Sequence, residues 1–214
     1  MCGRYYVEIS KDELSFINNI DSFNYSKNYN ISPQSEVPSV IDNNLVLTKW
    51  GYLPDWLKKQ NNPRPLFNTR VESLLEKKTF TSAFKNSRCL MPITGWYEWT
   101  EENDTKQPYF FFNQTQKIMF AAGLFWKRSS GVIETSIITR EAYDPLSTIH
   151  SRTPLILSDA AIETWLSNRD ILEVYENVKE LKVPTITFHK VDKAVNNPRN
   201  NNESLINQYQ DIPF

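Results

Sequence analysis

Residues 89–126 read CLMPITGWYEWTEENDTKQPYFFFNQTQKIMFAAGLFW, a stretch rich in β-branched and aromatic residues. These residue types favour strands, and the polar residues between them divide the stretch into strands at 89–99, 108–113 and 117–126. Glu98 stands inside the first of these strands, among three aromatic residues. The stretch therefore predicts consecutive strands of one protein core, with a carboxylate held among aromatic rings.

Similar strand signals occur on both sides of this stretch. They lie at 4–9, 36–41, 44–50, 132–139, 153–157 and 184–191. The sequence Asp42-Asn43-Asn44 separates two of these runs and predicts a hairpin turn. A run of asparagines at 196–203 predicts a loop.

Helical spacing is confined to four short segments. They are 11–19, 69–78, 158–168 and 170–180. Ser158 and Asp170 precede the last two as N-cap candidates. Because strands outnumber helices and do not alternate with them regularly, the sequence predicts an α+β fold built on largely antiparallel sheet.

The composition is that of a globular protein, with 214 residues of which 40% are hydrophobic and 13% aromatic. No Gly/Ser linker divides the chain, so we expect one domain over residues 1–214. Two cysteines and two histidines provide neither a disulfide framework nor the ligands of a structural zinc site, and no metal or cofactor is expected. Arg4 and Glu8 interrupt any signal peptide, and no apolar run approaches the roughly 20 residues of a membrane helix. These features predict a cytoplasmic protein, or a nuclear one in a eukaryote.

Positive charge is concentrated in one segment, although the net charge of the chain is −1. Residues 49–88 hold nine Lys or Arg against three Asp or Glu, a net +6 that leaves −7 for the remainder. Trp50, Trp56 and Phe67 are interleaved with these basic residues. Cations that bind phosphates and flat rings that stack on bases are the requirements of a groove for single-stranded nucleic acid. A solvated basic face over core tryptophans is the alternative interpretation.

Cys2 follows the initiator methionine, which is usually removed when the next residue is small. Removal would leave an α-amine and a thiol on adjacent carbons, with ordinary pKa values of about 8 and about 8.5. Such a pair reacts with an aldehyde to give a Schiff base, which the thiol then closes to a five-membered thiazolidine ring. The alternative is a thiol that packs beneath the first strand, which is the interpretation we adopt for Cys89.

Three further polar residues are candidates for chemistry. Glu98 should have a raised pKa among its aromatic neighbours, unless it faces solvent on an alternating strand. His150, two residues before Arg152, is either a general acid and base or a loop residue with satisfied hydrogen bonds. Asn68 is either the N-cap of the helix at 69–78 or a hydrogen-bond partner of a substrate. His189 is given no role.

Several short motifs occur together in a fixed order along the chain. They are Met1-Cys2-Gly3-Arg4-Tyr5, Asn30-Ile31-Ser32-Pro33, Trp50-Gly51-Tyr52-Leu53-Pro54-Asp55-Trp56, Asn68-Thr69-Arg70-Val71-Glu72, Arg88-Cys89-Leu90-Met91-Pro92 continuing to Gly95-Trp96-Tyr97-Glu98-Trp99, Ile149-His150-Ser151-Arg152 with Pro154, and Val195-Asn196. In this set the sequence resembles the SOS-response-associated peptidase (SRAP) family. Members of that family shield abasic sites in single-stranded DNA by covalent crosslinking.

The resemblance implies a single SRAP domain with curved or barrel-like sheet and short flanking helices. It makes Cys2 the crosslinking nucleophile and places Asn68, Glu98 and His150 on the family's other active-site positions. The residues expected to face DNA are Arg4, Trp50, Arg70 and Arg152. Thr153 stands where the family usually has Met, a departure that concerns local packing.

The function predicted from this resemblance is abasic-site processing by a monomer. Its partners would be single-stranded DNA with abasic sites and the replication machinery, in association with the nucleoid in a bacterium. Related chemistry would be lyase-like Schiff base formation, with peptidase activity limited to N-terminal processing. Two alternatives stay open: an N-terminal-nucleophile cysteine peptidase or hydrolase, in which Glu98 or His150 serves as base, and a non-covalent module that binds single-stranded DNA.

Overall fold

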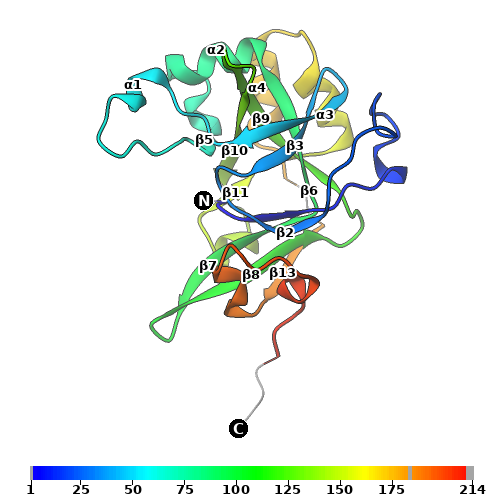
Figure 1. Ribbon diagram of the computed structural model, residues 1–214, viewed down its shortest axis with the longest axis vertical. Coiled ribbons are helices and arrows are strands. Elements are labelled where there is room, and N and C mark those ends of the chain that lie inside the picture. Colours follow the sequence, from blue (N-terminus) through cyan, green and yellow to red (C-terminus); the bar gives the residue numbers. More distant parts are fainter. Residues whose placement is uncertain (1, 183–184, 211–214) are drawn as a thin grey trace.

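A computed structural model describes residues 2–182 and 185–210, and it is built on two curved β-sheets with helices at one end (Figure 1). One sheet has five strands in the order β13-β8-β7-β1-β2, with every neighbouring pair antiparallel. Its strands are β1 (Tyr5–Val7), β2 (Asn28–Ile31), β7 (Gly95–Glu102), β8 (Thr105–Asn113) and β13 (Ile186–Lys190).

The second sheet has eight strands and closes on itself. They are β3 (Glu36–Ile41), β4 (Asn44–Trp50), β5 (Asn68–Arg70), β6 (Arg88–Ile93), β9 (Met119–Lys127), β10 (Ile133–Glu141), β11 (Arg152–Pro154) and β12 (Ile156–Leu157). Strand β10 pairs with β4, β4 with β3, β3 with β6, β6 with β9, and β9 again with β10. These pairings form a five-stranded barrel, and among the described strands of this sheet only the pairs of β10 with β4 and β5 are parallel. The α+β, largely antiparallel and barrel-like fold is therefore confirmed.

The stretch at 89–99 passes from one sheet to the other. The chain leaves the barrel at Ile93, the end of β6, and enters the five-stranded sheet at Gly95, the start of β7. Thr94 lies at this crossing, where its N–H donates to Tyr6 O at 2.9 Å and its hydroxyl accepts from Glu8 N at 2.9 Å. The predicted single strand is thus two strands, and the sharp change of direction is stabilised by bonds to β1 and the residue that follows it.

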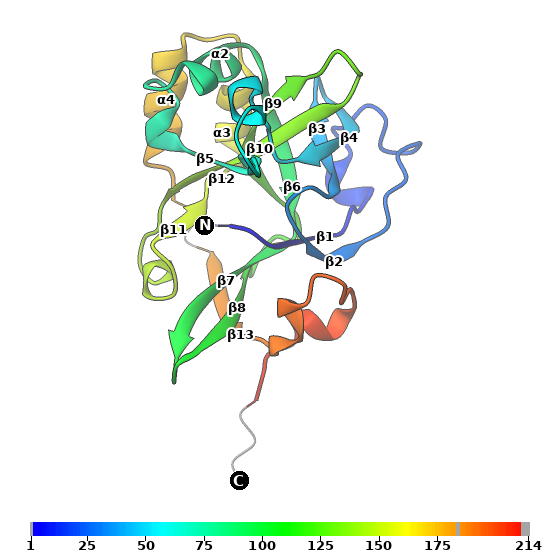
Figure 2. The same cartoon turned by 60° about the vertical axis from the view of Figure 1, so that its left-hand side comes forward.

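Two apolar clusters hold the sheets and helices together. One lies between barrel strands and the helices and includes Leu90, Phe84 and Trp165. The other combines barrel residues such as Met91 with residues of the five-stranded sheet such as Trp96. Because side chains alternate along a strand, each barrel strand contributes to both clusters. The end of the chain that carries Cys2 lies in the second cluster, where the sheets face each other (Figure 2).

The helices are short and gather at the end of the barrel remote from the five-stranded sheet (Figure 1). They are α1 (Asp55–Lys58), α2 (Lys78–Asn86), α3 (Asp159–Leu166) and α4 (Ile171–Lys179). The 3-10 turns are distributed more widely, with η4 and η5 beside the five-stranded sheet: η1 (Asp12–Leu14), η2 (Val71–Ser73), η3 (Leu146–Thr148), η4 (Lys193–Asn196) and η5 (Glu203–Ile206). No helix in the described ranges is both long and apolar enough to cross a membrane.

Predictions based on local capping and turn chemistry are confirmed. Ser158 caps α3 by accepting from Ala161 N, and Asp170 caps α4 by accepting from Leu172 N. The strands expected at 36–41 and 44–50 have those bounds, and the turn between them uses positive φ at Asp42 (51°) and Asn43 (57°). Such φ values suit the two-residue hairpin turn that the right-handed strand twist favours.

Predictions for segments governed by distant contacts are partly wrong. The helix expected at 69–78 is replaced by β5 and η2, because residues 68–70 pair with β10. The helix expected at 11–19 is reduced to η1 and turns. Strands β2 and β5 and helices α1 and α2 were not predicted. The strand expected at 184–191 corresponds to β13 (Ile186–Lys190), and its first expected residue, 184, lies outside the described residues.

Gly95 is expected to be intolerant of any side chain, because the Phe110 ring and the Phe111 carbonyl of the neighbouring strand β8 lie directly against it. A Cβ at Gly95 would lie 2.3 Å from the Phe110 ring and 2.6 Å from Phe111 O. We predict that Gly95→Ala lowers the free energy of unfolding by about 3 kcal/mol, measured by urea denaturation.

Gly131→Ala is the matched control. Gly131 has φ +85° but nothing within 4 Å of an added Cβ, so that only the backbone penalty of about 1 kcal/mol applies. A cost for Gly95→Ala no larger than that of the control would contradict the packing argument.

Candidate active site

Four of the predicted site residues meet between the two sheets. Cys2 precedes β1, Asn68 begins β5, Glu98 lies in β7 and His150 lies between η3 and β11. The Asn68 side-chain amide donates to Cys2 O at 2.6 Å, and His150 Nε2 lies 3.8 Å from Glu98 Oε2. The fold thus brings together side chains that are up to 148 positions apart in the sequence.

The pairing of β1 with β7 places Cys2 near Glu98. Tyr5 pairs with Trp96 in antiparallel register, and Tyr97 N donates to Arg4 O at 2.9 Å. Continuing that register toward the start of the chain brings residues 2 and 3 alongside residues 98 and 99. Backbone hydrogen bonds of the sheet, and not a flexible loop, therefore fix the position of the candidate nucleophile.

Cys2 is completely buried, packed in the second cluster with Tyr5 and Trp50. Burial raises the pKa of its thiol well above the ordinary range, and the nearby Glu98 carboxylate raises the pKa further. Both causes disfavour a thiolate. The Cys2 thiol accordingly needs a proton acceptor before its sulfur can react.

Glu98 is the buried acid of the site, with 3% of its side chain exposed. It shares a face of β7 with Trp96, two residues earlier, and this face is turned toward the barrel. Burial raises the pKa of Glu98 to about 7. The raised pKa predicted from its aromatic neighbours is confirmed, and the solvent-facing alternative is wrong. A carboxyl group with that pKa can accept and return a proton near neutral pH.

His150 is half-buried, and its two ring nitrogens have different surroundings. Nδ1 lies 3.0 Å from Arg152 N and 3.1 Å from Arg152 O, whereas Nε2 is directed toward Glu98. In the neutral ring Nδ1 can accept from the Arg152 N–H, which leaves the proton on Nε2. In the protonated ring Nδ1 can donate to the Arg152 carbonyl. Burial lowers the pKa of His150, so the neutral form is favoured near pH 7.

Asn68 does not cap a helix, which corrects one of its two predicted interpretations. Residues 68–70 form β5, and the following 3-10 turn has no side-chain cap. The Asn68 amide group instead holds the backbone of Cys2, and its Oδ1 is buried with no hydrogen-bond partner among the described residues. This oxygen can accept a hydrogen bond from a bound molecule.

The three predicted DNA-facing arginines differ in how they are held. Arg70 is exposed. Arg4 donates to Asn30 Oδ1 and Val195 O, both at 2.8 Å. Arg152 forms a two-pronged pair with Glu72, at 2.7 and 3.0 Å, and also donates to Thr139 O at 2.7 Å. Arg4 and Arg152 therefore also serve the fold, whereas the Arg70 side chain extends into solvent.

Trp50, which the family resemblance placed toward DNA, is buried, whereas Trp56 of the same motif is exposed. Trp50 is completely buried, donates from its indole N–H to Phe67 O at 2.9 Å and packs edge-on against Tyr5. Its ring has no face available for a base, so the expected contact with DNA is replaced by support of the strand that carries Cys2. Trp56 is 56% exposed on α1. Sequence periodicity gave no means of telling the two apart, since both stand in one motif.

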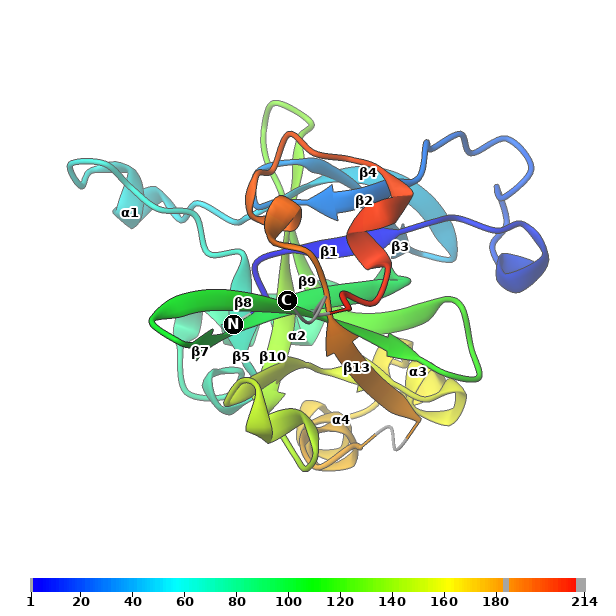
Figure 3. The same ribbon diagram turned by 90° about the horizontal axis from the view of Figure 1, so that it is seen from below.

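The basic segment also divides into exposed and structural residues. Arg88 donates to the carbonyl oxygens of Trp165, Phe84 and Ser167 and is partly buried, so it belongs to the core and not to a cation surface. We define residues 51–67 as the basic arm. The part of the arm that carries α1 projects away from both sheets (Figure 3), and Lys58, Lys59 and Arg64 are exposed on it.

The remaining histidine and possible metal ligands lie apart from this chemistry. His189 Nε2 lies 2.8 Å from Ile206 O, with its ring against Phe110 and Phe112. Within residues 2–182 and 185–210, no group of three or more His, Cys, Asp or Glu side chains is arranged to hold a metal ion.

Comparison with known proteins identifies the family. The sequence profile described as "SOS response associated peptidase (SRAP)" matches residues 1–198. The chain belongs to the SRAP family. "Abasic site processing protein YoqW" of Bacillus subtilis is 29% identical, with 98% of this chain and 100% of that protein covered. "Abasic site processing protein YedK" of Escherichia coli is 32% identical, with 83% of each chain covered.

Solved structures with the same fold are also found. A protein from Bacteroides thetaiotaomicron superposes with a TM-score of 0.75 at 21% identity, covering 86% of each chain. A phage-related protein from Bordetella bronchiseptica gives a TM-score of 0.71 at 21% identity, covering 90% of this chain and 95% of the other. The arrangement of two sheets around Cys2 is thus the SRAP fold, as the sequence motifs predicted.

Glu98 gives a test of the site's electrostatics. Because its pKa is raised to about 7 in the folded protein from an ordinary 4.5, the folded state binds its proton more tightly than the unfolded state. That contribution to stability is complete at low pH and is lost as the pH rises through about 7. We predict that, between about pH 4.5 and pH 8, the wild type loses about 3 kcal/mol of unfolding free energy relative to Glu98→Gln.

Urea denaturation at both pH values measures this difference. Gln has the shape of the protonated carboxyl group but does not titrate, so it is the matched variant. If the two proteins lose stability in parallel, Glu98 does not carry the raised pKa.

Proposed function

We propose that this SRAP protein processes abasic sites in single-stranded DNA by linking Cys2 covalently to the ring-opened sugar aldehyde. The observation that carries the proposal is the convergence of a buried carboxyl group, a histidine and an asparagine amide on the residue that follows Met1. The names of relatives that cover most of the chain support the class of lesion.

The covalent step uses both nucleophiles of Cys2 after Met1 is removed. The α-amine attacks the aldehyde carbon, and the resulting carbinolamine loses its hydroxyl group as water to give a Schiff base. The sulfur then bonds to the same carbon, while the thiol proton passes to the imine nitrogen. The product is a thiazolidine formed with the net loss of one water. Because amine and thiol are held on adjacent carbons, ring closure has a large proximity advantage.

Glu98 and His150 supply the proton transfers. Glu98, with a pKa near 7, takes a proton from the amine or the thiol and returns it to the departing hydroxyl group. His150 gives a proton to the sugar ring oxygen as the ring opens when its ring is in the protonated minority form, and its Nδ1 finds a partner on Arg152 in either protonation state. The high pKa of the buried thiol supports an order in which the amine reacts first and the sulfur second.

Asn68 holds the nucleophile and meets the sugar. Its amide fixes the Cys2 carbonyl at 2.6 Å, which limits rotation of the residue that carries both reacting groups. Its Oδ1 accepts a hydrogen bond from a sugar hydroxyl. The Asn68 amide nitrogen thus bonds the protein and its oxygen bonds the substrate, which accounts for an asparagine side chain that does not cap a helix.

The basic arm and Arg70 bind the strand around the lesion. Lys59 and Arg64 are exposed cations for phosphates, and Trp56 presents a flat ring for a base. A single strand is required because the sugar aldehyde is inaccessible within stacked duplex DNA.

Crosslinking is tested with an abasic oligonucleotide on a denaturing gel. The wild type is expected to form a band that survives denaturation, and Cys2→Ala is expected to form none. Cys2→Ala still has an α-amine once Met1 is removed, so addition of borohydride should restore a band by reducing its Schiff base. Cys89→Ala is the matched control and should crosslink like the wild type, because Cys89 is buried beside Gly123 in the barrel.

A stable Cys2→Ala band without borohydride would assign the nucleophile to another residue. A protein with an additional residue fixed before Cys2 should not crosslink, and normal crosslinking by that protein would exclude the free amine.

Salt dependence tests the strand-binding role of the arm. The double variant Lys59→Ala/Arg64→Ala should bind an oligonucleotide more weakly and lower the slope of log affinity against log salt by about 1.4, since each phosphate contact to a single strand contributes about 0.7. Lys182→Ala, at an exposed lysine outside the arm, is the control. An unchanged slope would remove the arm from the DNA contact surface.

A further inference from the structure

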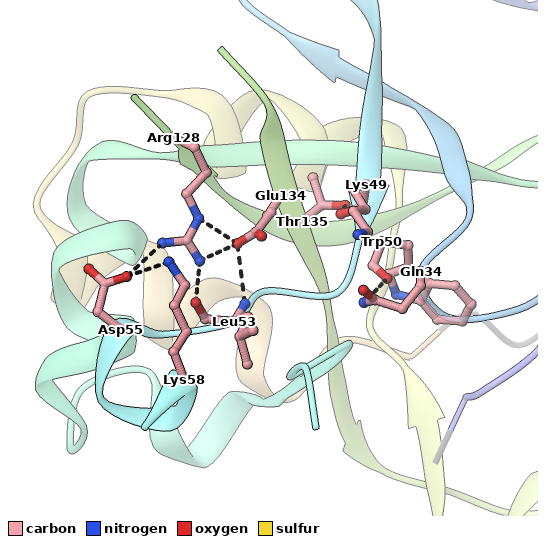
Figure 4. Close-up of polar contacts among 9 residues, drawn as sticks. All are labelled: Gln34, Lys49, Trp50, Leu53, Asp55, Lys58, Arg128, Glu134 and Thr135. Atoms are coloured by element: carbon pink, nitrogen blue, oxygen red, sulfur yellow. Dashed lines mark hydrogen bonds and ion pairs between the residues drawn. The ribbon is translucent and has the colours of Figure 1, made fainter. Parts of the chain in front are cut away.

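Arg128, just after β9, and Glu134, on β10, form an ion pair beneath the basic arm (Figure 4). Their side chains are only 19% and 13% exposed. Arg128 Nε donates to Glu134 Oε2 at 2.9 Å, and Nη2 donates to the same oxygen and to Leu53 O. Nη1 reaches Asp55 Oδ1 at 3.4 Å. A guanidinium group with all three nitrogens engaged has little capacity left for a phosphate.

The pair holds Leu53 at both of its backbone polar groups. Leu53 O accepts from Arg128, and Leu53 N donates to Glu134 Oε2 at 3.2 Å. These two side chains thus replace the ladder partners that a neighbouring strand would provide. Since Leu53 is the third residue of the arm, the contact fixes the arm at its root.

Aromatic contacts reinforce the same root. Tyr52 stacks on Trp126 with ring centres 3.9 Å apart, and the Arg128 guanidinium lies 5.2 Å from the Tyr52 ring centre. The returning end of the arm is tied by the Tyr52–Leu66 bridge and leads directly into Asn68. The base of the arm therefore adjoins the residue that holds Cys2.

We propose that Arg128 and Glu134 are positioning residues that latch the basic arm in the orientation in which it binds the DNA strand. This inference rests on the proposed function. The latch acts on the arm and not on the reacting atoms, so it governs strand affinity and leaves the crosslinking step unchanged. The latch also predicts that removing the negative charge of Glu134 weakens DNA binding. Charge attraction alone predicts the opposite, because DNA is a polyanion.

The first experiment measures binding without chemistry. The probe is a single-stranded oligonucleotide with a tetrahydrofuran abasic analogue, which has no aldehyde, and fluorescence anisotropy gives the dissociation constant. Arg128→Lys keeps the charge but loses the planar fork that bonds Glu134 and Leu53 together. We expect the dissociation constant to rise roughly fivefold, because the arm must then be ordered on binding. Crosslinking at saturating abasic DNA should proceed at the wild-type rate.

Glu134→Gln separates the latch from electrostatics. The substitution removes a negative charge, so attraction alone predicts tighter binding, whereas the latch predicts weaker binding. Glu173→Gln is the matched control: Glu173 forms an exposed pair with Arg169 at 2.6 Å on α4, and its loss should leave affinity unchanged or slightly increased.

Limited trypsin digestion measures the latch with no DNA present. Cleavage after Lys58 and Lys59 should be several-fold faster in Arg128→Lys and Glu134→Gln than in wild type or Glu173→Gln, with the melting temperature used to confirm that each protein is folded. Unchanged cleavage, or wild-type or tighter DNA binding by both variants, would overturn the latch. If the variants are cleaved faster but the wild type neither binds nor crosslinks abasic DNA, the contact between the pair and the arm stands and the proposed function is refuted.

Discussion

The antiparallel pairing of β1 with β7 is the contact on which the site depends. It extends the first residues of the chain alongside the segment that holds Glu98, so that a residue next to the terminus is as firmly placed as a core residue. Chain ends are ordinarily among the least ordered parts of a protein. Here Thr94, at the passage from the barrel to β7, donates to Tyr6 O and so ties β1 to the start of β7.

Burial then determines the protonation of Glu98 and Cys2 in the site. A carboxyl group removed from water holds its proton to a pKa of about 7, and a thiol removed from water resists ionisation. Near neutral pH the Cys2 thiol therefore keeps its proton at rest, whereas Glu98 is divided between its acid and its carboxylate forms and can accept or return a proton. The cost of burying Glu98 is a loss of stability as the pH rises through about 7.

Sequence reasoning succeeded where local chemistry decides and failed where distant contacts decide. The hairpin turn at Asp42 and the caps at Ser158 and Asp170 depend on neighbouring backbone groups, and all were predicted. The segment at 69–78 has helical spacing but pairs with β10, a partner that no local pattern reveals. Trp50 and Trp56 share one motif, yet only tertiary packing buries the first and exposes the second. The four candidate site residues could be named from ordered family motifs, while their mutual geometry and the bonds that engage Arg88 and Arg128 required the structure.

The central claim is that the α-amine and thiol of Cys2 close one ring on the abasic sugar. Mass spectrometry of the crosslinked peptide after digestion of the DNA tests this most directly. The account predicts a sugar remnant on residue 2, without Met1, at a mass equal to the sum of the parts less one water and unchanged by borohydride, since a thiazolidine has no imine to reduce. A remnant on a lysine, or one on Cys2 that gains two hydrogens with borohydride, would contradict it.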